Sequence, residues 1–164
     1  MRRCMPKLAV ALLVATSVRA QSIAIKDAPT AVIQTVSMRF PDAKIAGVST
    51  ETEEGKQVYE VTLRQNGRNI DATTTPAGQL TLIEREITAR DLPVSVTKLL
   101  RTKYPRATYK IVEEVTTVSG ASETPSFYEL LLVDAKKQRL EVQVALDGSR
   151  ILKEEKKKAG DPNE

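Results

Sequence analysis

The chain contains the stretch Asp27-Ala28-Pro29-Thr30-Ala31-Val32 and, 64 residues later, its counterpart Asp91-Leu92-Pro93-Val94-Ser95-Val96. At the same spacing, Arg39-Phe40-Pro41-Asp42-Ala43 returns as Lys103-Tyr104-Pro105-Arg106-Ala107. Further on, residues 58–63 match residues 127–132, and the spacing has grown to 69 residues. The sequence therefore predicts two tandem copies of one supersecondary unit, with an insertion of five residues near positions 119–126 of the second copy.

Each copy is predicted to open with a helix of about three turns. Asp27 and Asp91 stand two residues before a proline, which favours a helix start because a carboxylate and a proline both suit the first turn. Apolar residues then recur at helical spacing, as Val32, Ile33, Val36 and Phe40 in the first copy and Val96, Leu99, Leu100 and Tyr104 in the second. Pro41 and Pro105 are expected to end the helices, because proline disfavours helical geometry in the residue before it.

The rest of each copy alternates between apolar and polar residues, which is typical of half-buried strands. Tyr59, Val61 and Leu63 share one strand face, and Asn66-Gly67 predicts a hairpin turn after them. In the second copy, strands are expected at residues 109–118, 127–133, 140–146 and 151–155. One face of each sheet is expected to stay open to solvent or to a partner.

These patterns predict an α+β fold of two tandem repeats, each with one helix packed on a four-stranded antiparallel meander sheet. The predicted organisation is a signal peptide at residues 1–20, repeat 1 at 27–90, repeat 2 at 91–155 and a solvated tail at 156–164. Whether the two sheets join edge to edge is left open, although unpaired edges in an exported protein favour joining them.

Several landmarks recur in both copies. They are Pro29, Phe40, Pro41, Tyr59, Glu60, Val61 and Gly78, and then Pro93, Tyr104, Pro105, Tyr128, Glu129, Leu130 and Gly148. This combination resembles the PepSY-like domain family, and most closely its β-lactamase-inhibitor-like subset, over residues 27–86 and 91–155. The resemblance implies an exported, non-catalytic binding module, such as an inhibitor of a hydrolase.

Residues 1–20 have the features of a secretory signal peptide. Basic residues precede an apolar run at residues 8–15, and Val18-Arg19-Ala20 places small residues at the −3 and −1 positions before Gln21. The apolar run is too short to span a bilayer, so the mature protein is expected in the periplasm or outside the cell, without stable membrane insertion. The leader holds four of the 25 basic residues and none of the 21 acidic residues, so the mature net charge is zero and no nucleic-acid partner is expected.

The chain has no histidine, and its one cysteine, Cys4, lies in the leader. The mature sequence therefore excludes Ser-His-Asp and Cys-His catalysis, disulfides, and Cys/His zinc, haem or iron–sulfur centres. Among carboxylates, Glu113 and Glu114 are adjacent in a strand and point to opposite faces, while Glu60 and Glu129 are equivalent positions of the two copies. Neither pair suits acid–base chemistry, so no enzyme and no cofactor are expected.

Glu51 and Glu53 are weak candidates for a metal site. They share a strand face beside Glu54 and Gly55, but no Asp-x-Asp-x-Asp-Gly loop supplies further oxygen ligands. A solvated hairpin end is the preferred interpretation, and no bound metal is expected.

Two features predict a partner-binding surface. The insertion supplies Ser119, Gly120, Ser122, Glu123, Thr124 and Pro125, either as a mobile hairpin tip or as a recognition loop. Phe127, Leu131 and Val133 lie on the opposite strand face from Tyr128 and would form an apolar patch on the outer face of the second sheet. Such a patch would be buried by a protein partner, by packing of the two repeats on each other, or by a homodimer.

The sequence therefore predicts an exported, non-catalytic binding module that inhibits a periplasmic or secreted hydrolase by steric occlusion. The alternative is a structural or sensory envelope protein that binds cell-wall material, peptide or a cation.

Overall fold

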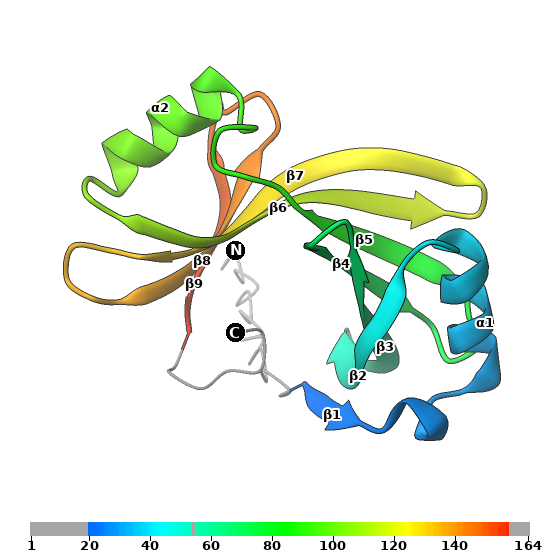
Figure 1. The fold of residues 1–164 in the computed structure, drawn as a ribbon. Coiled ribbons are helices and arrows are strands. Elements are labelled where there is room, and N and C mark those ends of the chain that lie inside the picture. The colour runs from blue at the N-terminus through cyan, green and yellow to red at the C-terminus, as the bar shows by residue number, and fades with distance from the viewer. Residues whose placement is uncertain (1–19, 54, 158–164) are drawn as a thin grey trace, which may run out of the picture.

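The protein is described by a computed structural model that covers residues 20–53 and 55–157, in which two α-helices pack on one antiparallel sheet (Figure 1). The helices are α1 (Thr30–Arg39) and α2 (Val94–Lys103), and a short 3-10 helix, η1 (Ile25–Asp27), precedes α1. The strands of the first half are β1 (Gln21–Ile23), β2 (Lys44–Glu53), β3 (Lys56–Gln65), β4 (Arg68–Thr74) and β5 (Leu80–Glu86). Those of the second half are β6 (Thr108–Ser119), β7 (Ser122–Val133), β8 (Arg139–Ala145) and β9 (Ile151–Lys157).

The predicted fold class, two repeats that each carry a four-stranded sheet, is wrong. All nine strands belong to one sheet, in the order β1 to β9, and each strand pairs antiparallel with its neighbours in sequence. β5 pairs with β6 from Leu82↔Thr117 to Glu86↔Glu113, so the two edges that would have been exposed in the middle of the molecule are joined. β1, which the sequence patterns did not predict, covers the edge of β2.

Both α-helices lie where the sequence predicts them. Pro29 and Pro93 stand immediately before the first helical residue, and Phe40 and Tyr104 cap the ends through backbone N–H bonds to the residue four positions earlier. The landmark glycines Gly78 and Gly148 lie at positive φ against the first turns of the helices. A Cβ atom at Gly148 would be 2.5 Å from the carbonyl carbon of Ser95, so only glycine fits there.

The molecule has two hydrophobic clusters, one under each helix. Val32 and Val36 of α1 pack with β2–β5, and Val96 and Leu100 of α2 pack with β6–β9. The predicted boundary at residues 90 and 91 falls between the helices, but Val118 of β6 belongs to the first cluster. The second half of the chain therefore helps to complete the core of the first half.

Both helices cover the same face of the sheet. Val112 contacts the cluster under α2 and Val118 contacts the cluster under α1, and these two residues are six positions apart on β6. Because side chains alternate between faces along a strand and the β6 backbone has no extra residue between them, an even spacing places both on one face. The opposite face, which we call the helix-free face, carries no helix among the described residues.

The segments predicted at the two ends of the chain lie mostly outside the described residues. The predicted signal peptide lies outside the described residues, except for Ala20, and so does most of the predicted tail. Lys156 and Lys157 of that tail are instead part of β9, because they pair with Leu140 and Arg139 of β8. No helix in the described part of the chain is long and apolar enough to cross a membrane.

Candidate functional site

The helix-free face carries carboxyl groups on each of five consecutive strands, β3 to β7. A row of five, one from each strand, consists of Glu60 on β3, Asp71 on β4, Glu84 on β5, Glu113 on β6 and Glu129 on β7. Each is adjacent in sequence to a residue buried under a helix: Val61, Ala72, Ile83, Val112 and Leu130, respectively. The alternation of strand side chains therefore directs all five carboxyl groups away from the helices. We call this set the carboxyl row.

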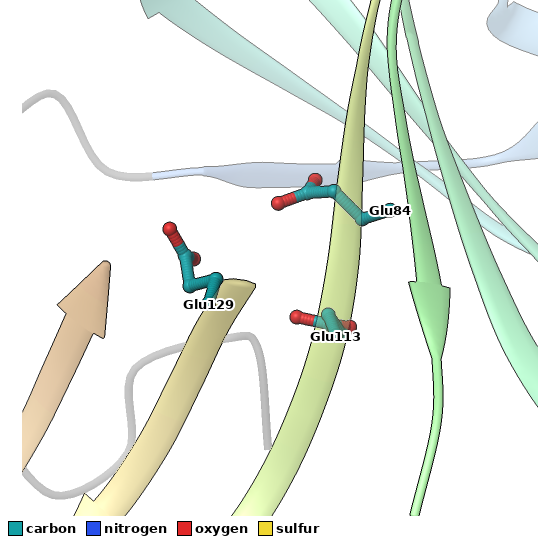
Figure 2. A group of neighbouring side chains, drawn as sticks. All are labelled: Glu84, Glu113 and Glu129. Atoms are coloured by element: carbon teal, nitrogen blue, oxygen red, sulfur yellow. The ribbon is translucent and has the colours of Figure 1, made fainter. Parts of the chain in front are cut away.

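Three members of the carboxyl row converge on one point. Asp71 lies opposite Glu84 in the β4–β5 register, and Glu113 lies opposite Glu129 in the β6–β7 register. Carboxylate oxygens of Glu84, Glu113 and Glu129 lie within 4.8 Å of one another. Figure 2 shows these side chains extending from three neighbouring strands into the same space. The joining of β5 to β6 creates this cluster, because it brings Glu84 of the first half beside Glu113 and Glu129 of the second.

Burial raises the pKa of several of these groups. It is the main cause for Glu84, whose pKa is raised to about 10, with the nearby carboxylates of Glu129 and Glu113 adding to the effect. The pKa of Glu113 is raised to about 8, again chiefly by burial and then by Asp71 and Glu129. The pKa of Glu60 is raised to about 8 by burial and by Asp71. Loss of solvent and repulsion between like charges both favour the neutral acid, so Glu60, Glu84 and Glu113 hold protons near neutral pH.

Neutral groups donate hydrogen bonds to Asp71 and Glu129, the members of the row on either side of Glu84 and Glu113. The hydroxyl of Thr62 donates to Asp71 Oδ1 at 2.6 Å, and Gln143 Nε2 donates to Glu129 Oε2 at 2.8 Å. Within the described residues, no lysine or arginine forms an ion pair with Glu84, Glu113 or Glu129. Cations act on Asp71 and Glu129 instead: Arg64 of β3 favours the ionised form of Asp71, and Lys153 and Lys157 of β9, which pair with Glu141 at 3.7 and 2.6 Å, favour that of Glu129.

Three convergent carboxylates are also the kind of oxygen ligands that divalent cations prefer. Carboxyl groups at this spacing can equally share protons, and their raised pKa values favour that state. No metal site is therefore assigned to them. Glu51 and Glu53, the weak metal candidates of the sequence, lie at the end of β2 and do not belong to the converging group.

The predicted apolar patch borders the carboxyl row. Phe127, Leu131 and Val133 alternate with residues of the α2 core, so they lie on the helix-free face with Glu129. All three are half-buried, and Phe127 lies opposite the fully buried Val115. The helix-free face thus combines apolar side chains on β7 with carboxyl groups on the strands beside them.

The predicted recognition loop is the end of a long hairpin. Ser119 and Ser122 pair across a turn in which Gly120 has a positive φ of 59°, and the hairpin reaches toward the α1 end of the molecule (Figure 1). All six predicted loop residues, Ser119, Gly120, Ser122, Glu123, Thr124 and Pro125, are exposed. Glu123, however, accepts hydrogen bonds from Arg39 of α1 at 2.8, 3.0 and 3.1 Å, which ties the hairpin to the first half.

The sequence patterns do not predict Asp71 or Glu84 as members of a site. They suggest only the pairs Glu113 with Glu114 and Glu60 with Glu129, because no single strand shows the register between β5 and β6. One signal was present in the sequence: each of the five acidic residues is adjacent to an apolar residue of a predicted strand.

Comparisons with known proteins show the fold. No family model matches the sequence, and no curated protein matches it. A structure described as a periplasmic protein from Bacteroides eggerthii has a TM-score of 0.62 at 14% identity, over 79% of this chain and 88% of that one. A DUF2874 family protein from Bacteroides uniformis has a TM-score of 0.61 at 16% identity, over 79% of this chain and 89% of that one.

A BLIP-like protein from Bacteroides fragilis is similar as well, with a TM-score of 0.58 at 15% identity over 84% of this chain and 92% of that one. The chain therefore has the fold that DUF2874 and BLIP-like proteins share. The periplasmic description of the Bacteroides eggerthii protein is consistent with the export predicted from the leader. The finer resemblance to tandem PepSY-like domains stays a prediction.

Proposed function

We propose that this protein is an exported, non-catalytic binding protein that holds a protein partner against its helix-free face. One observation carries the proposal: both α-helices cover the same side of a nine-stranded sheet, and no α-helix of the described residues covers the other side. Antiparallel sheets commonly pack one face on the core and present the other. The similarity in fold to a BLIP-like protein supports inhibition of a periplasmic or secreted hydrolase as the more specific role.

The surface contains the two elements that protein interfaces use. Phe127, Leu131 and Val133 offer apolar area on β7, and burial of apolar area is the main favourable contribution to most protein–protein association. The neighbouring carboxyl groups provide orientation and selectivity, because polar groups that lose water on binding must find partners. A hydrolase bound to this face would have its active site covered by the inhibitor, and inhibition would need no covalent step.

The alternative role is an envelope protein that binds cell-wall material, peptide or a cation. The half-buried carboxyl groups could serve such ligands, but the apolar residues beside them favour a protein surface. The experiment below separates the two roles.

The test uses the mature protein, Gln21–Glu164, as bait with the envelope and secreted fractions of its own organism. The informative variant is Leu131→Lys, which places a charge in the apolar part of the helix-free face. Its matched control is Val94→Lys at the start of α2, where the side chain is 85% exposed on the helix side of the sheet. The same charge is thus added to the two faces of one molecule.

We expect a captured hydrolase to lose activity in proportion to added protein, with an end point near one to one. Leu131→Lys should weaken this inhibition at least tenfold, and Val94→Lys should leave it unchanged. Equal inhibition by both variants would show that the helix-free face is not the binding surface. Binding to cell-wall material in place of a protein would support the envelope role.

A further inference from the structure

We propose that Glu84, Glu113 and Glu129 form a proton-dependent clamp across the β5–β6 junction, which tightens when the three groups share protons and loosens when all are ionised. Such a clamp goes beyond partner binding, because it needs only side chains of this protein and no bound ligand. It is therefore tested on the purified protein without any ligand.

The geometry of the three side chains makes their ionisation states depend on one another. Their carboxylate oxygens lie within 4.8 Å of one another, so three negative charges there would repel strongly in a half-buried setting (Figure 2). A protonated carboxyl group can instead donate a hydrogen bond to a neighbouring carboxylate. Protons therefore convert a repulsive contact between strands into an attractive one.

The surroundings reinforce this dependence. The charged groups that share the helix-free face with the cluster are Glu51 and Glu53 from β2, Glu60 and Arg64 from β3, Asp71 from β4, Glu86 from β5, Glu141 and Arg139 from β8, and Lys153, Glu155 and Lys157 from β9. Lys153 and Lys157 favour the ionised form of Glu129, and Arg64 favours that of Asp71. The neighbouring charges that act most strongly on Glu84 and Glu113 are all acidic, so protonation relieves their repulsion.

The position of the cluster gives its ionisation a structural effect. Among the strands that the structure describes, only β5 and β6 pair across the two halves, through five residue pairs from Leu82↔Thr117 to Glu86↔Glu113. Glu84 and Glu113 stand within this ladder, whereas Val118 and Glu123 cross between the halves farther along the β6–β7 hairpin. Repulsion in the cluster therefore acts on the junction and leaves the two cores in place.

The sign of the pH effect follows from the direction of the pKa shifts. The pKa values of Glu113 and Glu84 are raised to about 8 and about 10, so the folded protein keeps protons that the unfolded chain releases above about 4.5. The stability that these two groups contribute is therefore greatest below about pH 4.5, falls as the pH rises, and levels off only above about pH 10.

The test measures amide hydrogen exchange between pH 5 and pH 9, with each rate corrected for the intrinsic pH dependence of exchange. The informative variant is Glu84→Gln/Glu113→Gln, because glutamine has the size of a neutral glutamic acid and can donate a hydrogen bond but cannot ionise. The control is Asp42→Asn, which changes an exposed carboxyl group in the turn after α1.

In the natural protein, we expect protection of residues 82–86 and 113–117 to fall at least tenfold more than protection of the β2–β3 ladder. The double variant should lose this extra pH dependence, and Asp42→Asn should keep it. The proposal would be overturned if protection fell equally with pH in the β5–β6 and β2–β3 ladders. It would also be overturned if protection in the β5–β6 ladder of the double variant kept the pH dependence of the natural protein.

A second measurement covers the case in which the double variant does not fold. Carbon-13 NMR titration of the natural protein reports the carboxyl groups of Glu84, Glu113 and Glu129 directly. Midpoints well above 4.5 for Glu84 and Glu113 support the clamp, and three ordinary midpoints contradict it. These results do not depend on a partner, so failure of the clamp and failure of partner binding are observed separately.

Discussion

Arg39, the last residue of α1, binds both carboxylate oxygens of Glu123, which lies 84 positions later on β7. The contact joins the first helix to the hairpin that distinguishes the second half of the chain from the first. Arg39 also lies over the ring of Phe40, with its guanidinium carbon 5.1 Å from the ring centre. The inserted hairpin, interpreted from sequence as a mobile tip or a recognition loop, thus has a structural contact at Glu123.

A double-mutant cycle on Arg39→Ala and Glu123→Ala should give a coupling energy of about 0.5–1 kcal/mol in urea unfolding. The value is small because the two side chains are 41% and 37% exposed, and water screens their attraction. Lys26 and Asp27 form a more exposed pair, and the same cycle there should give no measurable coupling. Equal coupling in the two pairs would mean that the bidentate geometry of Arg39 adds nothing.

Replacement of Gly148 by alanine should destabilise the protein by about 3 kcal/mol, because a Cβ atom there would overlap the backbone at the start of α2. Gly67 is the control, since it also has a positive φ, of 80°, but nothing lies within 4 Å of its added Cβ. Gly67→Ala should therefore show only the backbone strain, about 1 kcal/mol. Thermal unfolding measures the loss of stability in each variant. Equal losses in Gly148→Ala and Gly67→Ala would contradict the close packing of Gly148 on the helix.

Truncation of Val118 to alanine should reduce stability by about 2 kcal/mol, although the residue lies in the second half of the chain. Its side chain is 8% exposed and packs in the cluster under α1. Hydrogen exchange should show the loss of protection in β3–β5 more than in β7–β8. The control Val94→Ala removes the same atoms from an exposed site and should change stability little.

The pKa of Asp91 in the folded protein should lie below the ordinary value for aspartate. The backbone N–H and the hydroxyl of Thr88 both donate to Asp91 Oδ2 at 2.8 Å, which lowers the pKa of this carboxyl group. The stability that this contact supplies is present above about pH 3.8 and is lost as the pH falls through the lower folded value. NMR titration of Asp91 measures the shift, and Thr88→Ala should move the midpoint upward.

Local features of the fold could be predicted from the sequence. Pro29 and Pro93 locate the helix starts, and Asn66-Gly67 locates a hairpin turn, because proline and glycine restrict or extend the backbone at their own positions. The single sheet could not be predicted, because the pairing of Leu82 with Thr117 depends on two strands separated by a helix. β1 is only three residues long, too short to show a periodic pattern.

The candidate site was predicted only in part. The alternation along β7 correctly separates Phe127 and Leu131 from the α2 core. The convergence of Glu84 with Glu113 and Glu129 depends on the register between β5 and β6, and on the register of β6 with β7. Neither register is determined by the residues of one strand alone, so the carboxyl row became visible only in three dimensions.

The order of strand pairing also affects the order in which parts of the chain can fold. Each strand pairs only with the strands before and after it in sequence, so a chain that emerges from a membrane pore N-terminus first can add its strands one after another. Short separations between paired segments favour fast closure. The contacts of Val118 and Glu123 with the first half are different, because they must wait until the β6–β7 hairpin has emerged. The first helix and its strands are therefore the earliest part to form, and they reach their final packing only when the later hairpin arrives.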